Sequence, residues 1–222
     1  MGTAAMIGRG NMALTDKSCV DFAEVLASKA PVPGGGGGSA MVGALGAALG
    51  SMVCNLTVGK KTYAAVEDEV KGVLADLDAI RGKMLRLVEE DAVVFEPLAK
   101  AYGIKAVTPE EKAEKDRVME AALRKACSVP VEIVRQSMAA LKLLDVLSVK
   151  GSRLAISDVA VGALFCQSAL LGGRYNVIIN TSLMKDREYA AAIDTDIDAL
   201  ATEGAALAEA IAGVVEQRIK KA

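Results

Sequence analysis

The sequence predicts an all-α protein, an antiparallel helical bundle that contains one long kinked helix. Three observations support this fold class. Between residues 62 and 102, apolar residues recur at helical spacing and do not alternate as in a strand. Thr108-Pro109-Glu110-Glu111 has the sequence of a capped helix start, with proline at the first helical position. Aromatic residues make up only 3 % of the chain, which argues against a β-sandwich core.

The length and composition favour one cytoplasmic domain. A chain of 222 residues can bury a sizeable core without disulfides or metal. Residues 1–15 are expected to form a disordered or tag-like tail, and residues 16–222 a single helical domain. The four cysteines are far apart and include no C-x-x-C pair, which is typical of a reduced, cytoplasmic protein. The net charge of −2 points to neither a nucleic-acid nor a membrane partner.

Glycine-rich and apolar segments divide the first sixty residues. A short amphipathic helix is expected over residues 21–29. Residues 34–38 are all glycine and are expected to form a loop before an apolar helix over residues 39–58. That helix is long enough to span a bilayer and contains Gly46-x-x-x-Gly50. Because it is rich in Ala, Gly and Ser, we interpret it as the buried centre of a soluble bundle.

Proline and glycine set the expected ends of the later helices. The long helix over residues 62–102 is expected to kink at Pro97. The helix that begins at Thr108 is expected to end near Ser128, ahead of Pro130. Four further helices are then expected, over residues 130–150, 157–173, 175–184 and 187–220, and residues 176–179 fit a strand equally well.

The chain has no histidine and no tryptophan, and this excludes several mechanisms. Neither a Ser-His-Asp nor a Cys-His nucleophile system is possible, and no His-ligated zinc or haem site can form. The proton carriers of an enzyme with this composition are carboxylates, lysines, cysteines or tyrosines. The scarcity of aromatic residues also argues against a platform for stacking nucleic-acid bases.

Asp91 interrupts the apolar face of the long helix. Leu77, Met84 and Leu98 share its seven-residue register, so all four residues lie on one face. Burial would raise the pKa of this carboxyl. It could then accept and return protons near neutral pH, an effect worth about 10²–10⁴-fold in rate. The structural alternative is an aspartate that pairs with a lysine or caps a neighbouring helix.

Two segments beside the apolar helix could bind a ligand. The glycines between Pro33 and Ser39 would let a ligand approach the N–H groups of a helix N-terminus, although a flexible linker has the same composition. Lys60 and Lys61, near Tyr63, follow the helix and could hold ligand carboxylates. Their alternative role is to pair with the dipole at the helix C-terminus.

A third polar group lies late in the chain. Asn176 and Asn180 are one helical turn apart among apolar residues, and Asp158 lies upstream. Buried amides need hydrogen-bond partners, so these side chains bind either the backbone or a polar ligand.

The motifs occur in a characteristic order: Pro33-Gly-Gly-Gly, Gly43-Ala-Leu-Gly-Ala-Ala-Leu-Gly-Ser-Met-Val53, Leu56-Thr-x-Gly-Lys-Lys-x-Tyr63, Glu90-Asp91-Ala92, Thr108-Pro-Glu-Glu-Lys112, Val129-Pro130, Ser157-Asp158 and Asn176-Val-x-x-Asn180. In this order they resemble the cyclodeaminase/cyclohydrolase family of folate enzymes, over residues 18–218. The resemblance implies an all-helical homodimer. Many relatives read Pro-Gly-Gly-Gly-Ser, and Gly37 stands here in place of that serine. The longer glycine run looks more like the stand-alone bacterial methenyltetrahydrofolate cyclohydrolases.

The resemblance implies reversible hydrolysis of 5,10-methenyltetrahydrofolate to 10-formyltetrahydrofolate. Asp91 matches the catalytic aspartate of the family, which acts as proton acceptor and donor. Lys60 and Lys61 are implied either to face the negatively charged glutamate tail or to help position Asp91. No metal or cofactor is implied, and the folate is the substrate. Two alternatives stay open: a formiminotetrahydrofolate cyclodeaminase that releases ammonia, and a non-catalytic helical dimer that binds folate or a protein partner. The residues implied to bind substrate are Pro33, Gly34, Gly35, Gly36, Lys60, Tyr63, Asp158, Asn176 and Asn180.

Overall fold

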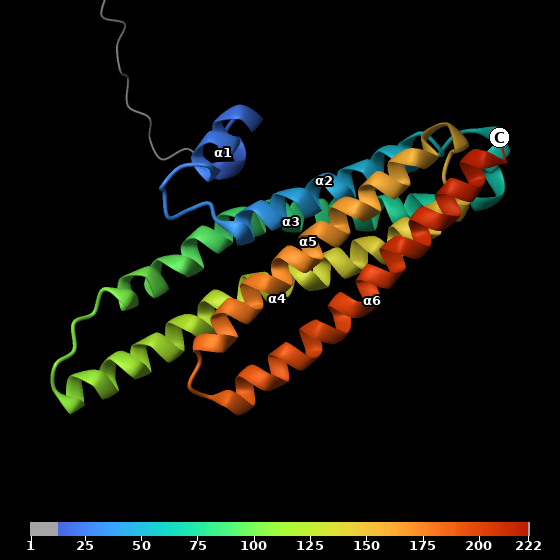
Figure 1. Ribbon diagram of the computed structural model, residues 1–222. Coiled ribbons are helices and arrows are strands. Elements are labelled where there is room, and N and C mark those ends of the chain that lie inside the picture. Colours follow the sequence, from blue (N-terminus) through green and yellow to red (C-terminus); the bar gives the residue numbers. More distant parts are fainter. Residues whose placement is uncertain (1–12, 222) are drawn as a thin grey trace, which may run out of the picture.

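The structure, a computed structural model, describes residues 13–221 and confirms the all-α class. Within this range every regular element is helical. Five long helices run side by side in an elongated bundle, and the short helix α1 lies against one end of α2 (Figure 1). In chain order the elements are η1 (Leu14–Asp16), α1 (Cys19–Leu26), α2 (Gly35–Asn55), η2 (Lys61–Val66), α3 (Glu67–Tyr102), α4 (Pro109–Lys150), η3 (Arg153–Ala155), α5 (Ile156–Leu183) and α6 (Arg187–Lys220).

The antiparallel pair α2 and α5 forms the centre of the bundle. Helix α2 packs against α3, α4 and α5, while α5 packs against α2, α4 and α6. Small residues allow the pair to approach closely. A Cβ atom on Gly46 would lie 2.6 Å from the Cys166 sulfur and 2.9 Å from the Gly162 carbonyl oxygen. The glycines of this apolar helix therefore serve helix packing.

Two stretches pass a length and composition test for membrane spans, namely Gly35–Asn55 and Arg153–Leu183. In the most apolar 18 residues of the first stretch, 56 % of the residues are buried inside the bundle. The corresponding share in the second stretch is 44 %. The buried faces of these helices form the core of the bundle with α3 and α4. Their apolar character is therefore explained in large part by packing within the chain.

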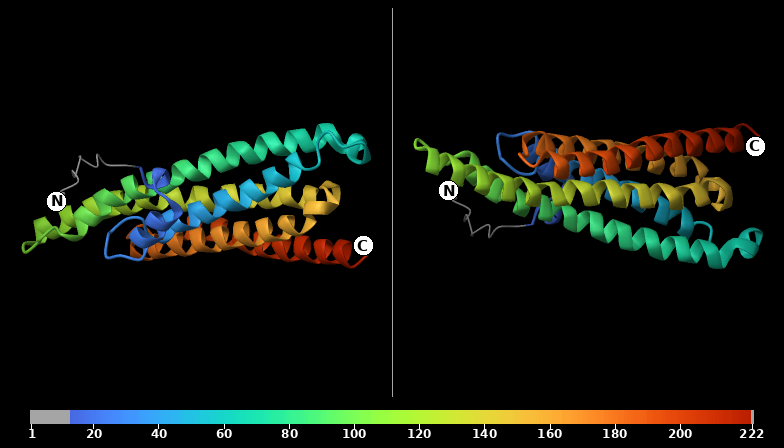
Figure 2. Two further views of the ribbon diagram at one scale, coloured as in Figure 1. Left: turned by 90° about the horizontal axis from the view of Figure 1, so that it is seen from above. Right: turned by 90° about the horizontal axis from the view of Figure 1, so that it is seen from below.

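The outer faces of α2 and α5 are also apolar. Seen from above, the two helices lie side by side on the near face, and no other described helix covers them along most of their length (Figure 2). Tyr175 is 67 % exposed and Leu45 is 49 % exposed. The exposed large apolar side chains along these two helices are Leu45, Met52, Leu56, Val161, Leu164, Phe165, Tyr175, Ile179 and Leu183.

Two expected helix ends are absent, and these predictions were wrong. Helix α4 continues through Pro130, which is buried. A proline inside a helix costs about 3 kcal/mol. The neighbouring residues Ile133 and Val134 are fully buried, and their packing offsets this cost. Helix α5 continues through Gly172 and Gly173 and includes residues 176–179.

The two glycines in α5 mark a close helix contact and not a helix end. A Cβ atom on Gly172 would lie 2.2 Å from the Ser39 hydroxyl oxygen, and one on Gly173 would lie 3.0 Å from Val134. Glycine therefore lets α5 approach α2 and α4 at this level. The sequence alone does not distinguish this use of glycine from helix termination.

The start of α2 also differs from the prediction. The helix begins at Gly35 and not at Gly38 or Ser39, so most of the expected glycine loop is helical. Of the expected tail, residues 1–12 lie outside the described residues. Thr15 belongs to η1, and both its backbone N–H and its hydroxyl donate hydrogen bonds to the Glu89 carboxylate on α3.

Several other predictions are confirmed. Helix α6 has the expected bounds. The Thr108 side chain accepts a hydrogen bond from the Glu111 N–H, and the Glu111 carboxylate accepts one from the Thr108 N–H, as a capping box requires. The first residues of the expected long helix form the 3₁₀ turn η2, and α3 then runs from Glu67 through Pro97 to Tyr102, so the kink at Pro97 stays a prediction.

Candidate active site

Asp91 on α3 caps the N-terminus of α2. The Gly37 N–H donates a hydrogen bond of 2.9 Å to Oδ2 of Asp91. The N-cap residue of α2 is Gly34, which has no side chain to cap the helix. A helix N-terminus has free N–H groups and a partial positive charge, so it stabilises a carboxylate there. The structural alternative considered for Asp91, a cap on a neighbouring helix, is therefore present.

The glycine sequence makes this approach possible. A Cβ atom on Gly36 would lie 2.3 Å from Oδ1 of Asp91, a distance that no side chain can occupy. A Cβ atom on Gly37 would lie 3.3 Å from the Pro33 side chain. The buried Pro33 and the first glycines of α2 therefore form a tight backbone wall around the carboxyl group.

Burial raises the pKa of Asp91 above its ordinary value, and the Gly37 hydrogen bond opposes this shift in part. The other three residues in its register, Leu77, Met84 and Leu98, are buried in the core. Among residues 13–221, no lysine or arginine forms an ion pair with Asp91. The carboxyl group is thus poised to exchange a proton at a higher pH than an exposed aspartate.

Asn176 on α5 lies beside the same glycine wall. A Cβ atom on Gly35 would lie 3.2 Å from its amide nitrogen. The Nδ2 group of Asn176 donates to the Gly172 carbonyl at 2.8 Å, and that of Asn180 donates to the Asn176 carbonyl at 2.8 Å. These bonds within α5 hold both amides in place. The structure therefore brings together Asp91, the glycine segment and Asn176, with Asn180 one turn further along α5.

The remaining predicted site residues lie at the other end of the bundle. Lys60 donates to the Ser152 hydroxyl at 3.3 Å, and the Tyr63 hydroxyl accepts a hydrogen bond from the Arg153 N–H at 2.9 Å. Lys61 is exposed, and Asp158 lies in the first turn of α5. Helix α2 separates this end from the glycine segment by about 30 Å, at 1.5 Å per residue.

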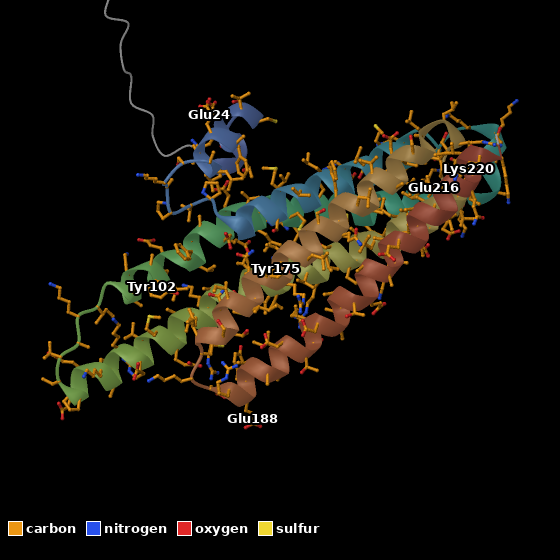
Figure 3. The ribbon with its side chains drawn as sticks, viewed as in Figure 1. Glu24, Tyr102, Tyr175, Glu188, Glu216 and Lys220 are labelled. Atoms are coloured by element: carbon orange, nitrogen blue, oxygen red, sulfur yellow. The ribbon has the colours of Figure 1, made fainter. Side chains whose placement is uncertain are left out.

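A single chain therefore does not bring Lys60, Lys61, Tyr63 or Asp158 to Asp91. Figure 3 shows the two places through labelled side chains: Tyr175, the neighbour of Asn176, lies near the middle of the bundle's length, whereas Lys220 lies at the end of the bundle where α2 finishes.

Sequence reasoning missed one direct partner of Asp91. Gly37 was noted only because it replaces a serine, yet its N–H is the donor to the carboxylate. The described part of the chain contains no group of three or more Cys, Asp or Glu side chains arranged to hold a metal ion. The Asp91 carboxyl group beside the glycine-lined start of α2 supports proton transfer as the candidate chemistry at this site.

Comparison with known proteins identifies the family of this chain. The profile described as Formiminotransferase-cyclodeaminase matches residues 18–199. The chain is 37 % identical over 198 residues to the methenyltetrahydrofolate cyclohydrolase of Methylorubrum extorquens, and the match covers 89 % of this chain and 95 % of that protein.

Two further relatives extend the comparison. The formimidoyltransferase-cyclodeaminase of Mus musculus is 28 % identical over 92 % of this chain, which spans only 38 % of that longer protein. The crystal structure of formiminotetrahydrofolate cyclodeaminase from Thermotoga maritima matches with a TM-score of 0.76 at 27 % identity, and the match covers 92 % of this chain and 96 % of that one. The profile match, the 37 % identity and the shared fold together show that this chain belongs to the formiminotransferase-cyclodeaminase family of enzymes.

Proposed function

We propose that this protein is a methenyltetrahydrofolate cyclohydrolase, which reversibly hydrolyses 5,10-methenyltetrahydrofolate to 10-formyltetrahydrofolate. The single observation that supports this most strongly is the half-buried Asp91 carboxyl, whose pKa is raised by burial, at the glycine-lined start of α2. The cyclohydrolase of Methylorubrum extorquens matches this chain over almost its whole length, which supports the same choice.

The proposed reaction needs one water molecule and three proton transfers. The substrate carries a cationic amidinium carbon that is already electrophilic. As the water oxygen bonds to this carbon, Asp91 accepts one water proton. Asp91 then passes this proton to the ring nitrogen as the carbon–nitrogen bond breaks. The remaining hydroxyl proton leaves to solvent, and the formyl group stays on the other nitrogen.

The raised pKa of Asp91 suits both steps. A carboxylate with an ordinary pKa near 4 is a weak base and accepts a proton from water inefficiently at neutral pH. Burial raises the pKa of Asp91, so its carboxylate is a stronger base than that of an exposed aspartate. The Gly37 N–H keeps the group oriented in each form, because a carboxylate and a neutral carboxyl oxygen both accept a hydrogen bond.

The glycine backbone is proposed to line the folate cleft. Gly34 and Gly35 have main-chain groups that are at least partly exposed, so a flat pterin ring can approach them, and the buried Gly36 lies directly against Asp91. The amides of Asn176 and Asn180, held by bonds within α5, are proposed to bind the polar edge of the pterin. The substrate is then held by backbone and amide groups.

A second candidate activity is that of a formiminotetrahydrofolate cyclodeaminase. The structural similarity to the Thermotoga maritima cyclodeaminase favours it. In this reaction, which forms the methenyl bridge, the leaving group is ammonia. The same carboxyl group would deliver a proton to that leaving group.

We further propose that the enzyme is a cytoplasmic homodimer. The exposed apolar side chains on α2 and α5 form one face along the bundle, of the kind that a second subunit buries. Three of the four cysteines are buried and all are free thiols, which suits a reducing compartment.

Loss of methenyltetrahydrofolate absorbance, measured against the buffer alone, tests the proposed activity. The proposal predicts that the enzyme accelerates this loss, and an unchanged rate would refute it. Ammonia release from 5-formiminotetrahydrofolate, measured on the same sample, separates the two enzymes. Release at a rate above that of methenyl hydrolysis would favour the cyclodeaminase.

A further inference from the structure

The first turn of α2 has no side chain of its own to hold it in place. Residues 34–38 are all glycine, so Ser39 is the first residue of α2 that has a side chain. A glycine backbone has more conformational freedom than that of any other residue. The position of this turn therefore depends on contacts from neighbouring groups. Asp91 on α3 supplies one of them at the Gly37 N–H, and Ser39 supplies another.

The Ser39 hydroxyl lies where the start of α2 meets α5. It donates a hydrogen bond of 2.7 Å to the Gly35 carbonyl oxygen in the glycine turn. On its other side, a Cβ atom on Gly172 would lie only 2.2 Å from the Ser39 Oγ. The hydroxyl therefore fills the space that glycine leaves open at position 172, and it contacts both the glycine turn and α5.

Gly172 in turn orients the amide of Asn176. The Asn176 Nδ2 group donates a hydrogen bond of 2.8 Å to the Gly172 carbonyl oxygen. A carbonyl oxygen only accepts hydrogen bonds, so the Oδ1 atom of Asn176 points away from it. A Cβ atom on Gly35 would lie 3.2 Å from Nδ2 and 3.5 Å from Oδ1. Gly35, Ser39, Gly172 and Asn176 therefore form a closed ring of contacts between α2 and α5.

The free side of the Asn176 amide is a hydrogen-bond acceptor. Within residues 13–221, its Oδ1 atom accepts no hydrogen bond, and the side chain is half-buried. Asn180, one turn further along α5, has the same arrangement, because its Nδ2 group donates to the Asn176 carbonyl at 2.8 Å. Two acceptors on one helix face suit a ligand that carries N–H donors. A pterin has such donors in its ring N–H and its amino group.

We propose that Ser39 is a positioning residue, which holds the Asn176 amide with its oxygen towards the N–H donors of the substrate ring. The inference rests on the proposed function for the identity of that substrate. The ring of contacts itself does not depend on it. Loss of the Ser39 hydroxyl would leave a space between α2 and α5 at Gly172. The two helices would shift there, and the Asn176 oxygen would no longer face the ligand.

The expected effect is on substrate binding. Loss of one hydrogen bond between neutral groups weakens binding by about 3- to 10-fold. Asp91 belongs to α3 and is held by the Gly37 N–H, which is outside the ring of contacts. Proton transfer should therefore continue at a similar rate. We expect Ser39→Ala to raise KM for methenyltetrahydrofolate by about 3- to 10-fold and to change kcat by less than about 2-fold.

Two further variants check that the hydroxyl is the cause. Ser39→Thr keeps the hydroxyl and should restore KM. The Thr202 hydroxyl in α6 already makes the same kind of bond, to the carbonyl of Asp198 at 2.8 Å. Ser182→Ala is the matched control, because Ser182 is exposed near the end of α5 and its hydroxyl bonds only the Ile179 carbonyl, at 2.9 Å. It should keep the KM of wild type.

A double-mutant cycle tests whether Ser39 acts through Asn176. Asn176→Ala removes the amide that Ser39 is proposed to position. In that background, Ser39→Ala should raise KM no further, because there is no amide left to misplace. If the two substitutions multiply their effects on KM, or if Ser39→Ala lowers kcat as much as it raises KM, the positioning role is overturned.

NMR of the asparagine side chains tests the position of the amide without any assay of activity. The chain has only four asparagines, so protein labelled with ¹⁵N-asparagine gives four side-chain NH2 pairs, and Asn176→Ala assigns one of them. Ser39→Ala should shift the Asn176 pair and speed the exchange of its protons with water. Ser182→Ala should leave this pair unchanged.

The outcomes separate this inference from the proposed function. If wild type does not hydrolyse the methenyl substrate, the proposed function fails, and the NMR spectrum still decides whether Ser39 holds the amide. If wild type is active but Ser39→Ala keeps the wild-type KM, Ser39 does not position a group that binds substrate. An Asn176 signal that is the same in Ser39→Ala and wild type would likewise overturn the inference.

Discussion

The Asp91 carboxylate on α3 accepts a hydrogen bond of 2.9 Å from the Gly37 N–H at the start of α2. This contact gives one residue two roles. It caps a helix that has no capping side chain of its own, and it holds a partly buried acid in a fixed orientation. A hydrophobic residue at position 91 would fit the register better but would leave the N-terminus of α2 uncapped.

The first prediction concerns stability and pH. Burial raises the pKa of Asp91, so the folded state binds its proton more tightly than the unfolded chain does. The free energy of unfolding therefore falls as the pH rises from the ordinary carboxyl pKa, about 4, through the raised value. Asp91→Asn does not ionise and keeps an oxygen for the Gly37 N–H. We expect this variant to be more stable than wild type at neutral pH and equally stable in acid.

Urea denaturation over a series of pH values measures this difference. Asp91→Ala is the companion variant, because it cannot cap α2 and should lose about 1 kcal/mol. A difference between Asp91→Asn and wild type that is the same at every pH would show that ionisation of Asp91 is not coupled to folding.

The second prediction concerns the glycine wall. Gly36→Ala places a Cβ 2.3 Å from Oδ1 of Asp91, so the carboxyl group must move. We expect a loss of activity together with about 1–3 kcal/mol of stability. Gly38→Ala is the matched control in the same helix, because its Cβ would lie 3.8 Å from the nearest atom of Leu26. It should gain about 0.5–1 kcal/mol from helix propensity and keep its activity, as thermal unfolding and initial rates will report.

A third prediction restores the serine that many relatives carry. A Cβ on Gly37 would lie 3.8 Å from Oδ2 of Asp91, so the hydroxyl of Gly37→Ser can reach the carboxylate. A hydrogen bond to the ionised form lowers the pKa. We expect the acidic limb of the pH profile of kcat/KM to move to lower pH. Gly37→Ala adds the same Cβ without a hydroxyl, and an equal shift in both variants would rule out the hydrogen bond as the cause.

The fourth prediction tests the packing of α2 against α5. Gly46→Ala would bring a Cβ within 2.9 Å of the Gly162 carbonyl, a backbone atom that cannot move without shifting the helix. It should lose about 1–3 kcal/mol. Gly72→Ala in α3 meets no atom within 4 Å and should gain about 0.5–1 kcal/mol. Chemical denaturation of both variants checks the contrast, and a Gly46→Ala variant as stable as wild type would contradict it.

Periodicity and capping predicted most of the fold. The seven-residue register around Asp91 identified the buried face of α3, and the capping box fixed the start of α4. The errors at Pro130 and at Gly172 have one cause. The local sequence around each residue indicates a helix end. Packing against other helices keeps both helices continuous. A single sequence does not reveal which neighbour a buried proline or glycine contacts.

The site was predictable in part. Asp91 stood out because a charged residue interrupts an apolar register, and the glycine segment stood out by composition. The prediction that Lys60 and Lys61 lie at the same site as Asp91 did not take account of the length of the apolar helix that separates them from the glycine segment. Two segments that flank a helix of this length lie about 30 Å apart, so one chain cannot place both at one ligand atom.

The most direct test of the account compares wild type and Asp91→Asn in methenyltetrahydrofolate hydrolysis, with folding of both verified by circular dichroism. Because asparagine retains the cap on α2 but cannot carry a proton, the account predicts a fall of about 10²–10⁴-fold in kcat. Equal rates for the two proteins would contradict the central claim that Asp91 moves the proton.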